Sequence, residues 1–131
     1  MNVPLDEARQ LLRAATRDRL SFELLLGTGR APHETLGFLA QQACEKLIKA
    51  VLVRHGARVE LTHDLERLFD LAVEQHIAVP VSGDVLRCLN PYAVALRYES
   101  TETIWIKDAD AMAIVKTLHE WASIKIAADE T

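Results

Sequence analysis

The segment Thr62-His63-Asp64 places an imidazole beside a carboxylate, a pair of side chains that can do acid–base chemistry. A histidine whose ring is oriented by a carboxylate can act as a general base. The alternative is a helix start, in which Thr62 caps the helix, Asp64 complements the positive end of its dipole, and His63 caps or packs. The residue types alone permit both interpretations.

A second candidate segment, from Asn90 to Glu99, contains two tyrosines and an arginine. The planar guanidinium of Arg97 suits bidentate binding of a phosphate. It suits equally well an ion pair with Asp18, a carboxylate that shares the phase of an apolar helical stripe and needs a partner if it is buried. Both partners for Arg97 stay open.

Polar side chains also gather at helical spacing in two other places. One group is Gln41, Gln42, Glu45 and Lys46, which forms either a solvated helix face or a ridge used in a subunit or ligand interface. The other is Arg9, Arg13 and Arg17, four residues apart, which forms either a ridge that contacts nucleic-acid phosphates or an exposed face paired with Asp6 and Glu7.

Two further residues have clear alternatives. Trp105 has few apolar neighbours in the sequence, so it either contributes to a self-complementary interface or closes the end of a core. Cys44 lies among apolar residues with no histidine placed by the sequence to activate it, so we expect a small buried hydrophobic side chain.

The elements that must position these residues are helical, because apolar residues recur every three to four positions almost throughout. We expect helices over residues 5–26, 34–55, 64–75, 84–98 and 107–127, with a kink at Asn90-Pro91 and a connector at 77–81. The expected fold is therefore all-α: one domain over residues 1–131, folded as an up-and-down antiparallel bundle of four to five helices.

Composition narrows the function classes. The chain has 131 residues, 50% of them hydrophobic and 26% charged, which is typical of a globular domain with a core. A net charge of −4 argues against general nucleic-acid binding by a positive field, although a local basic groove is compatible with it. Two separated cysteines and no clustered histidines give no reason to expect a disulfide, a metal or another cofactor. With no apolar run of about 18 residues and no signal peptide at the start, we expect a cytoplasmic protein without membrane contact.

Several of these segments, in this order, resemble the HEPN family of small prokaryotic helical domains over about residues 5–125. The matching residues are Ala8 to Ala15 with Asp18, the string Gly37-Phe38-Leu39-Ala40-Gln41-Gln42-Ala43-Cys44-Glu45-Lys46 with Lys49-Ala50, then His63-Asp64-Leu65, and Tyr92-Ala93-Val94 with Arg97-Tyr98. The Phe-x-Ala-Gln-Gln-Ala-x-Glu-Lys string followed by His-Asp-Leu is the most specific part.

The resemblance implies an up-and-down helical bundle that forms a homodimer. Many HEPN domains are encoded beside a minimal nucleotidyltransferase, with which they form a toxin–antitoxin-like pair. Many are metal-independent ribonucleases with an Arg-x(4–6)-His motif, and others bind nucleotides or RNA without catalysis. The arginine that looks like the motif arginine here is Arg97, and the positions where the histidine would follow hold Glu102, Thr103 and Ile104.

This departure leaves three hypotheses. The first is a homodimeric nucleotide- or RNA-binding module that works with a minimal nucleotidyltransferase, with Asp64, Arg97 and Tyr98 binding nucleotide or phosphate. The second is a metal-independent endoribonuclease toxin with an atypical site, in which Arg97, Tyr98 and His63 are the catalytic candidates. Here Arg97 would stabilise phosphorane charge, and His63 would contribute only if the fold brings it to Arg97. The third is a purely structural helical partner.

Overall fold

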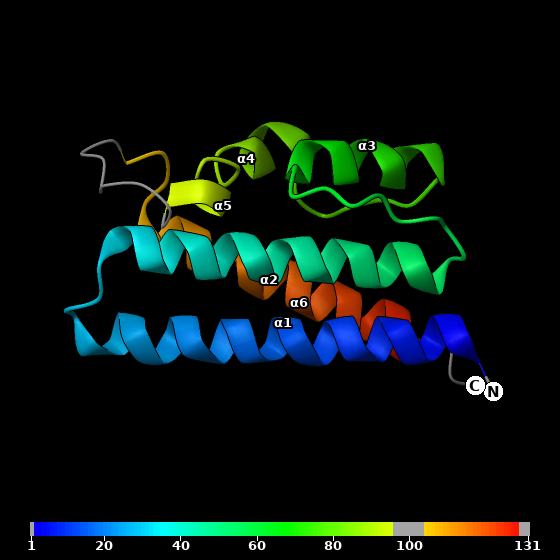
Figure 1. The fold of residues 1–131 in the computed structure, drawn as a ribbon, viewed down its shortest axis with the longest axis horizontal. Helices are drawn as coiled ribbons and strands as arrows, with labels where there is room; N and C mark the ends of the chain where they lie inside the picture. The colour runs from blue at the N-terminus through cyan, green and yellow to red at the C-terminus, as the bar shows by residue number, and fades with distance from the viewer. Residues whose placement is uncertain (1, 96–103, 129–131) are drawn as a thin grey trace.

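A computed structural model describes residues 2–95 and 104–128 of the chain, and every regular element among them is a helix (Figure 1). The helices are α1 (Val3–Thr28), α2 (His33–Arg54), α3 (Leu65–Glu74), α4 (Gly83–Arg87), α5 (Tyr92–Ala95) and α6 (Asp108–Ala128). The all-α bundle expected from the apolar periodicity is confirmed.

The ends of α1 follow from local chemistry. The Asn2 side chain accepts a hydrogen bond from the Leu5 amide at 3.1 Å, and Pro4 stands in the first turn, where its missing N–H costs nothing. At the other end Gly29 adopts a left-handed conformation with φ 68°, which a residue with a Cβ rarely takes. Between them the helix is 26 residues long and buries one narrow face.

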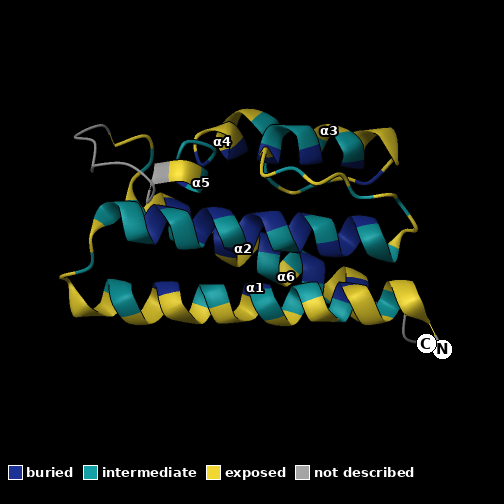
Figure 2. Cartoon of the chain, viewed as in Figure 1, coloured by how far each residue is buried: buried dark blue, intermediate teal, exposed yellow. Residues whose placement is uncertain are grey.

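The middle of the bundle is occupied by α2, which packs against α1, α6, α3 and α5. Figure 1 shows α1 and α2 side by side, with α6 against the pair and α3, α4 and α5 along the other side of α2. Figure 2 shows that buried residues extend around much of α2, whereas those of α1 are confined to one stripe. The central place of α2 explains why polar side chains on this helix are drawn into the interior.

The prediction of one continuous helix over residues 84–98 is wrong. The structure has two short helices, α4 and α5, joined by turns at residues 88–91. Pro91 lacks an amide hydrogen and disfavours helical geometry at Asn90, and the Asn90 side chain bonds to the start of α3 instead. Residues 96–98 lie outside the described part of the chain.

The four other expected helices are confirmed to within a few residues, and the connector at 77–81 is not helical. Within residues 2–95 and 104–128, none of the helices combines the length and apolar character needed to cross a membrane. The same residues contain no group of three or more histidine, cysteine or acidic side chains arranged to hold a metal ion.

Candidate functional site

Glu45, on the central helix α2, is the middle of a polar cluster. Its carboxyl side chain is only 6% exposed and receives three hydrogen bonds. Lys49 donates to Oε2 at 2.9 Å, while Gln41 donates to Oε1 at 3.1 Å and Nδ1 of His63 lies 2.7 Å from the same oxygen. Gln41, Glu45 and Lys49 are four residues apart, which places them on one side of α2. The fourth member, His63, comes from the loop before α3.

The carboxyl of Glu45 is held in its charged form. Burial alone raises the pKa of Glu45, but the hydrogen bonds from Lys49, His63 and Gln41 outweigh that effect and hold the pKa below its usual value. A buried carboxylate with a cation and an imidazole as partners is therefore present at neutral pH. This carboxylate accepts the hydrogen bond that orients the histidine ring.

Gln41 is a fully buried amide whose hydrogen bonds tie the His63 loop to α2. Its Nε2 donates to the backbone oxygen of His63 at 2.9 Å as well as to Glu45, and its oxygen accepts from Gln42 at 2.7 Å. A buried amide with both ends bonded stabilises one arrangement of the surrounding chain. Gln41 is therefore a positioning residue for His63.

The His63 ring is fixed on one side and open on the other. Its side chain is 68% exposed, yet Nδ1 is anchored to Glu45. Because the carboxylate can only accept, Nδ1 carries a hydrogen, and Nε2 has no hydrogen-bond partner among the described residues. An oriented imidazole of this kind can accept a proton, or donate one when protonated, at a defined point on the surface.

The neighbour of His63 in the sequence, Asp64, does not orient the ring. Asp64 caps α3: its Oδ1 accepts from the amides of Glu66 at 3.0 Å and Arg67 at 3.3 Å. Thr62, expected as the cap, instead accepts from the Asp64 amide at 3.1 Å. The segment starts a helix, as one interpretation of the sequence predicted. A carboxylate also contacts the imidazole, as the other interpretation predicted, but that carboxylate belongs to Glu45 and not to Asp64.

Arg97 and Tyr98 lie outside the described residues, so their proximity to His63 stays a prediction. The chain leading toward them contacts the start of α3 through Asn90. The Asn90 oxygen accepts from the Leu65 amide at 2.8 Å, and its Nδ2 donates to Asp64 at 2.8 Å. The segment before α5 is therefore attached beside the loop that carries His63.

Asp18 has a partner other than the one weighed from the sequence. Lys46, on α2, donates to the Asp18 carboxylate at 2.6 Å, which joins α1 to α2. The solvated face considered for this part of α2 is wrong for Gln41 and Glu45, which are buried. The physical reason is that α3 and the His63 loop cover that side of the helix, a long-range contact that periodicity does not encode.

A second cluster was missed by the sequence reasoning. His33, at the start of α2, has Nδ1 2.7 Å from Asp108 of α6 and Nε2 2.6 Å from the hydroxyl of Tyr92. The same hydroxyl accepts from the amides of Trp105 at 3.1 Å and Ile106 at 3.4 Å, so its own hydrogen goes to His33. These residues are far apart in the sequence, and no local spacing marks them.

Comparison with protein families decides what kind of domain carries these clusters. The family model of the HEPN domain matches residues 8–125, which is nearly the whole chain. The chain belongs to the HEPN domain family. No curated protein matches it, and no solved structure does. Membership supports a nucleotide- or RNA-related module as the general class of function.

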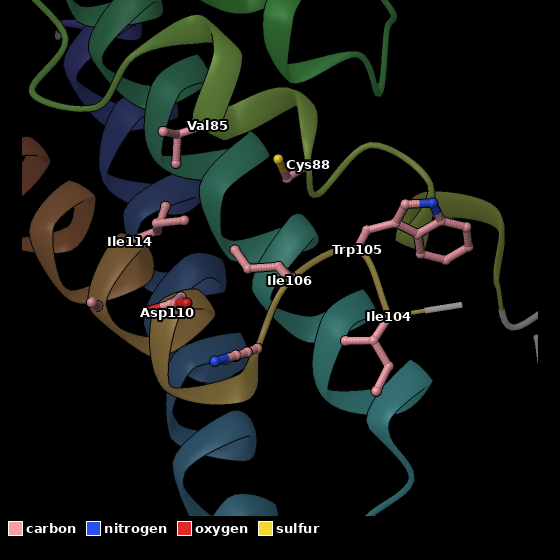
Figure 3. A pocket seen from close by; sticks show the side chains of 9 residues that line it. Val85, Cys88, Ile104, Trp105, Ile106, Asp110 and Ile114 are labelled. Atoms are coloured by element: carbon pink, nitrogen blue, oxygen red, sulfur yellow. The ribbon is translucent and has the colours of Figure 1, made fainter. Parts of the chain in front are cut away.

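A hollow on this HEPN domain lies near Trp105 and not at His63. It has a volume of about 860 Å³ and lies between α4, the 104–107 segment and α6 (Figure 3). Trp105 is 37% exposed and packs edge-on against Tyr92, with ring centroids 5.2 Å apart. Trp105 therefore contacts the bundle through Tyr92 and also leaves apolar surface open, and its part in an interface between copies stays a prediction.

Cys44 is confirmed as a buried apolar side chain of the HEPN domain. It is 0% exposed, and burial raises the pKa of its thiol, which opposes formation of the reactive thiolate. A nucleophilic role at this position is therefore unsupported.

Proposed function

We propose that this HEPN domain is a homodimeric nucleotide- or RNA-binding module that works with a minimal nucleotidyltransferase in a toxin–antitoxin-like pair. The observation that carries the proposal is the exposed His63 ring, which is held at Nδ1 by the buried Glu45 carboxylate and has no hydrogen-bond partner at Nε2 among the described residues. A side chain that is already fixed loses little conformational entropy when it binds. Family membership supports the ligand class.

The site can bind an anion or a nucleoside only with cations beyond those that already form ion pairs there. Lys49 is committed to Glu45, and Lys46 is committed to Asp18, so neither ammonium is free for a phosphate. In the proposed site Arg97 supplies the guanidinium for the phosphate, and Tyr98 supplies an aromatic face. The exposed carboxylate of Asp64 accepts a hydrogen bond from a sugar hydroxyl or a base amine.

Binding is tested by titrating a fluorescent single-stranded RNA and a fluorescent adenine nucleotide, each followed by anisotropy. His63→Gln removes the imidazole and Arg97→Ala the cation; we expect each to weaken binding about tenfold or more, as loss of a charge-assisted hydrogen bond would. His76→Asn is the matched control, because it removes an exposed imidazole elsewhere and asparagine tolerates the φ of 60° at that position. Equal affinity of His63→Gln and the parent would overturn the site.

The second candidate, a metal-independent endoribonuclease, is favoured by one specific observation. A histidine with Nδ1 bonded to a carboxylate and Nε2 exposed has the arrangement of a general base. In that reaction Nε2 of His63 removes the proton of the ribose 2′-hydroxyl, and Arg97 stabilises the charge of the phosphorane. The protonated form of His63 or the Tyr98 hydroxyl then returns a proton to the leaving oxygen.

Incubation with structured and single-stranded RNA in excess EDTA separates the two candidates. Cleavage by the parent that is lost in both His63→Gln and Arg97→Ala supports the nuclease. Binding without cleavage supports the module. The nucleotidyltransferase partnership is tested separately, by co-expressing the chain with a nucleotidyltransferase reading frame found next to its gene and measuring co-purification. Failure of the two to form a complex would remove that part of the proposal.

A further inference from the structure

The loop between α2 and α3 carries a leucine that the core does not cover. Figure 1 shows the chain turning back along α2 before α3 begins. Leu61, in this loop, is fully exposed and stands two residues before His63. Within residues 57–72, all of which the structure describes, it is the only large apolar side chain that is exposed. Single exposed apolar side chains are common on protein surfaces, so the way the loop holds Leu61 has to decide whether it has a role.

Hydrogen bonds on both sides of Leu61 fix the loop. Before it, the Glu60 carboxylate accepts from Nε of Arg67 at 3.1 Å and from a terminal nitrogen of the same guanidinium at 2.7 Å. After it, the backbone oxygen of His63 accepts from α2 at 2.9 Å. The Thr62 amide donates to the Glu60 oxygen at 2.9 Å, which closes a three-residue turn with Leu61 at its apex. The turn therefore holds the Leu61 side chain out from the protein.

The exposure pattern places Leu61 and His63 on the same side of this segment. Both are exposed, whereas Thr62 between them is half-buried, as expected where residues two apart share a side of an extended backbone. The Cα atoms of two such residues are at most about 7 Å apart. One small molecule can therefore contact the apolar side chain of Leu61 and the open ring of His63 together.

We infer, on the basis of the proposed function, that Leu61 packs on the face of a nucleobase whose ribose bonds to His63. Nε2 of the neutral His63 ring is a hydrogen-bond acceptor, because Nδ1 carries the hydrogen. A ribose hydroxyl is a donor that lies directly beside the base. Leucine is among the side chains that pack against base faces in nucleic-acid complexes. Because a base face is open only where the base is unstacked, the ligand class is a free nucleotide or single-stranded RNA.

The surroundings of Leu61 favour a base over a protein partner. A stable protein interface buries about 800 Å² on each partner, with its energy concentrated in a cluster of buried anchors. Leu61 instead stands alone among exposed polar side chains, those of Glu60, His63 and Asp64. A single base needs one apolar contact for its face and polar groups for its edge and its sugar, which is the combination present here.

The test compares two fluorescent oligomers by anisotropy: an oligoadenylate, and the ribose-phosphate oligomer of the same length that lacks every base. Leu61→Ser removes the apolar contact, so we expect about tenfold weaker binding of the oligoadenylate and unchanged binding of the abasic oligomer. Leu61→Phe keeps an apolar face and should bind the oligoadenylate at least as tightly as the parent. His63→Gln should weaken both oligomers, because its contact is with the sugar.

Leu24→Ser is the matched control. It makes the same replacement at a 65% exposed leucine on α1, which lies on the other side of α2 from α3 (Figure 1). Urea denaturation shows that each variant is folded. Because Leu61 is fully exposed, we expect the midpoint of Leu61→Ser to equal that of the parent, so that a change in affinity reports the contact and not the fold.

The outcomes separate this inference from the proposed function. If Leu61→Ser binds the oligoadenylate like the parent while His63→Gln binds it more weakly, the role of Leu61 is overturned and the His63 site stands. A parent that binds neither oligomer overturns both. Equal weakening of the two oligomers by Leu61→Ser overturns the base contact, since the loss would then lie in the sugar-phosphate chain. Unchanged RNA affinity with lost co-purification of the nucleotidyltransferase would assign Leu61 to a protein partner and also overturn it.

Discussion

Two histidine–carboxylate pairs in this protein have the same N–O distance but differ in which partner is exposed. His63 lies 2.7 Å from Glu45, and His33 lies 2.7 Å from Asp108, in both cases through Nδ1. In the first pair the carboxylate is buried at 6% exposure and the ring is open at 68%. In the second the carboxylate is 37% exposed and the ring only 20%. The contact itself therefore does not distinguish a pair with an open ring from a pair with an enclosed one.

The second ring nitrogen makes the difference. Nε2 of His33 is occupied by the buried hydroxyl of Tyr92, which also receives two backbone amides from the 104–107 segment. This pair joins the start of α2, α5 and the start of α6. Nε2 of His63 has no partner among the described residues, so it can meet a ligand. A histidine–carboxylate pair is thus available for chemistry only where the fold leaves the other nitrogen open.

The largest effect is expected from breaking the His33 pair through its packing. A Cβ added at Gly37 would stand 2.2 Å from Cδ1 of the Tyr92 ring, so Gly37→Ala must displace a fully buried side chain. We expect the free energy of unfolding to fall by about 3 kcal/mol. Urea denaturation measures it, with Gly27→Ala as control, because nothing lies within 4 Å of that position. A neutral Gly37→Ala would mean that Tyr92 is not held against α2.

Removing the charge of each carboxylate sharpens the comparison. Glu45→Gln leaves the Lys49 ammonium, only 14% exposed, without its anionic partner, and we expect a loss of about 2 kcal/mol together with weaker ligand binding. Asp108→Asn acts on a more exposed carboxylate and should cost less and leave binding intact. Denaturation and anisotropy titrations of both variants test this, and equal losses would remove the distinction between the two pairs.

Tyr92→Phe keeps the ring and removes only the hydroxyl of the His33 pair. The amides of Trp105 and Ile106 and Nε2 of His33 then lose their shared partner, for an expected loss of about 1.5 kcal/mol. RNA or nucleotide affinity should equal that of the parent, because His63 is untouched. A fall in affinity as large as that of His63→Gln would show that the two clusters act together.

The smallest effect is a pH dependence from a third histidine, His119, whose two nitrogens are both engaged. Thr16 donates its hydroxyl to the Leu12 oxygen and so accepts from Nε2 of His119 at 2.9 Å, while Arg19 donates to Nδ1 at 3.0 Å. Burial, followed by the charge of Arg19, lowers the pKa of His119 below its ordinary value of 6.5, against the weaker opposing charges of Glu23 and Glu120.

A lowered folded-state pKa means that the stabilisation from His119 is complete above the unfolded value of 6.5 and is lost as the pH falls through the folded-state pKa. We expect the melting temperature to decline modestly between pH 7 and pH 5, and the part due to His119 to vanish in His119→Gln. An unchanged pH profile in that variant would assign the decline to groups other than His119; Glu45 is not one of them, because its lowered pKa acts only below 4.5.

The sequence by itself determined the helices and the identity of the family. The apolar spacing placed four of the five expected helices, and the string from Gly37 to Lys46 with His63-Asp64-Leu65 pointed to the HEPN domain that the family comparison confirms. These signals are local: a helix repeats every 3.6 residues, and a motif is read within a short segment. They also marked His63 as a candidate, although with the wrong carboxylate as its partner.

Only the tertiary structure decided which side chains meet. Glu45 reaches His63 across 18 residues and His33 reaches Asp108 across 75, contacts set by how the helices pack around α2. At the break between α4 and α5, where Pro91 gives a local signal, the tertiary structure adds the bond from the Asn90 side chain to the start of α3, which lies 25 residues earlier. Periodicity gives the side of a helix on which a residue lies, but packing alone selects what covers that side and which polar groups it buries.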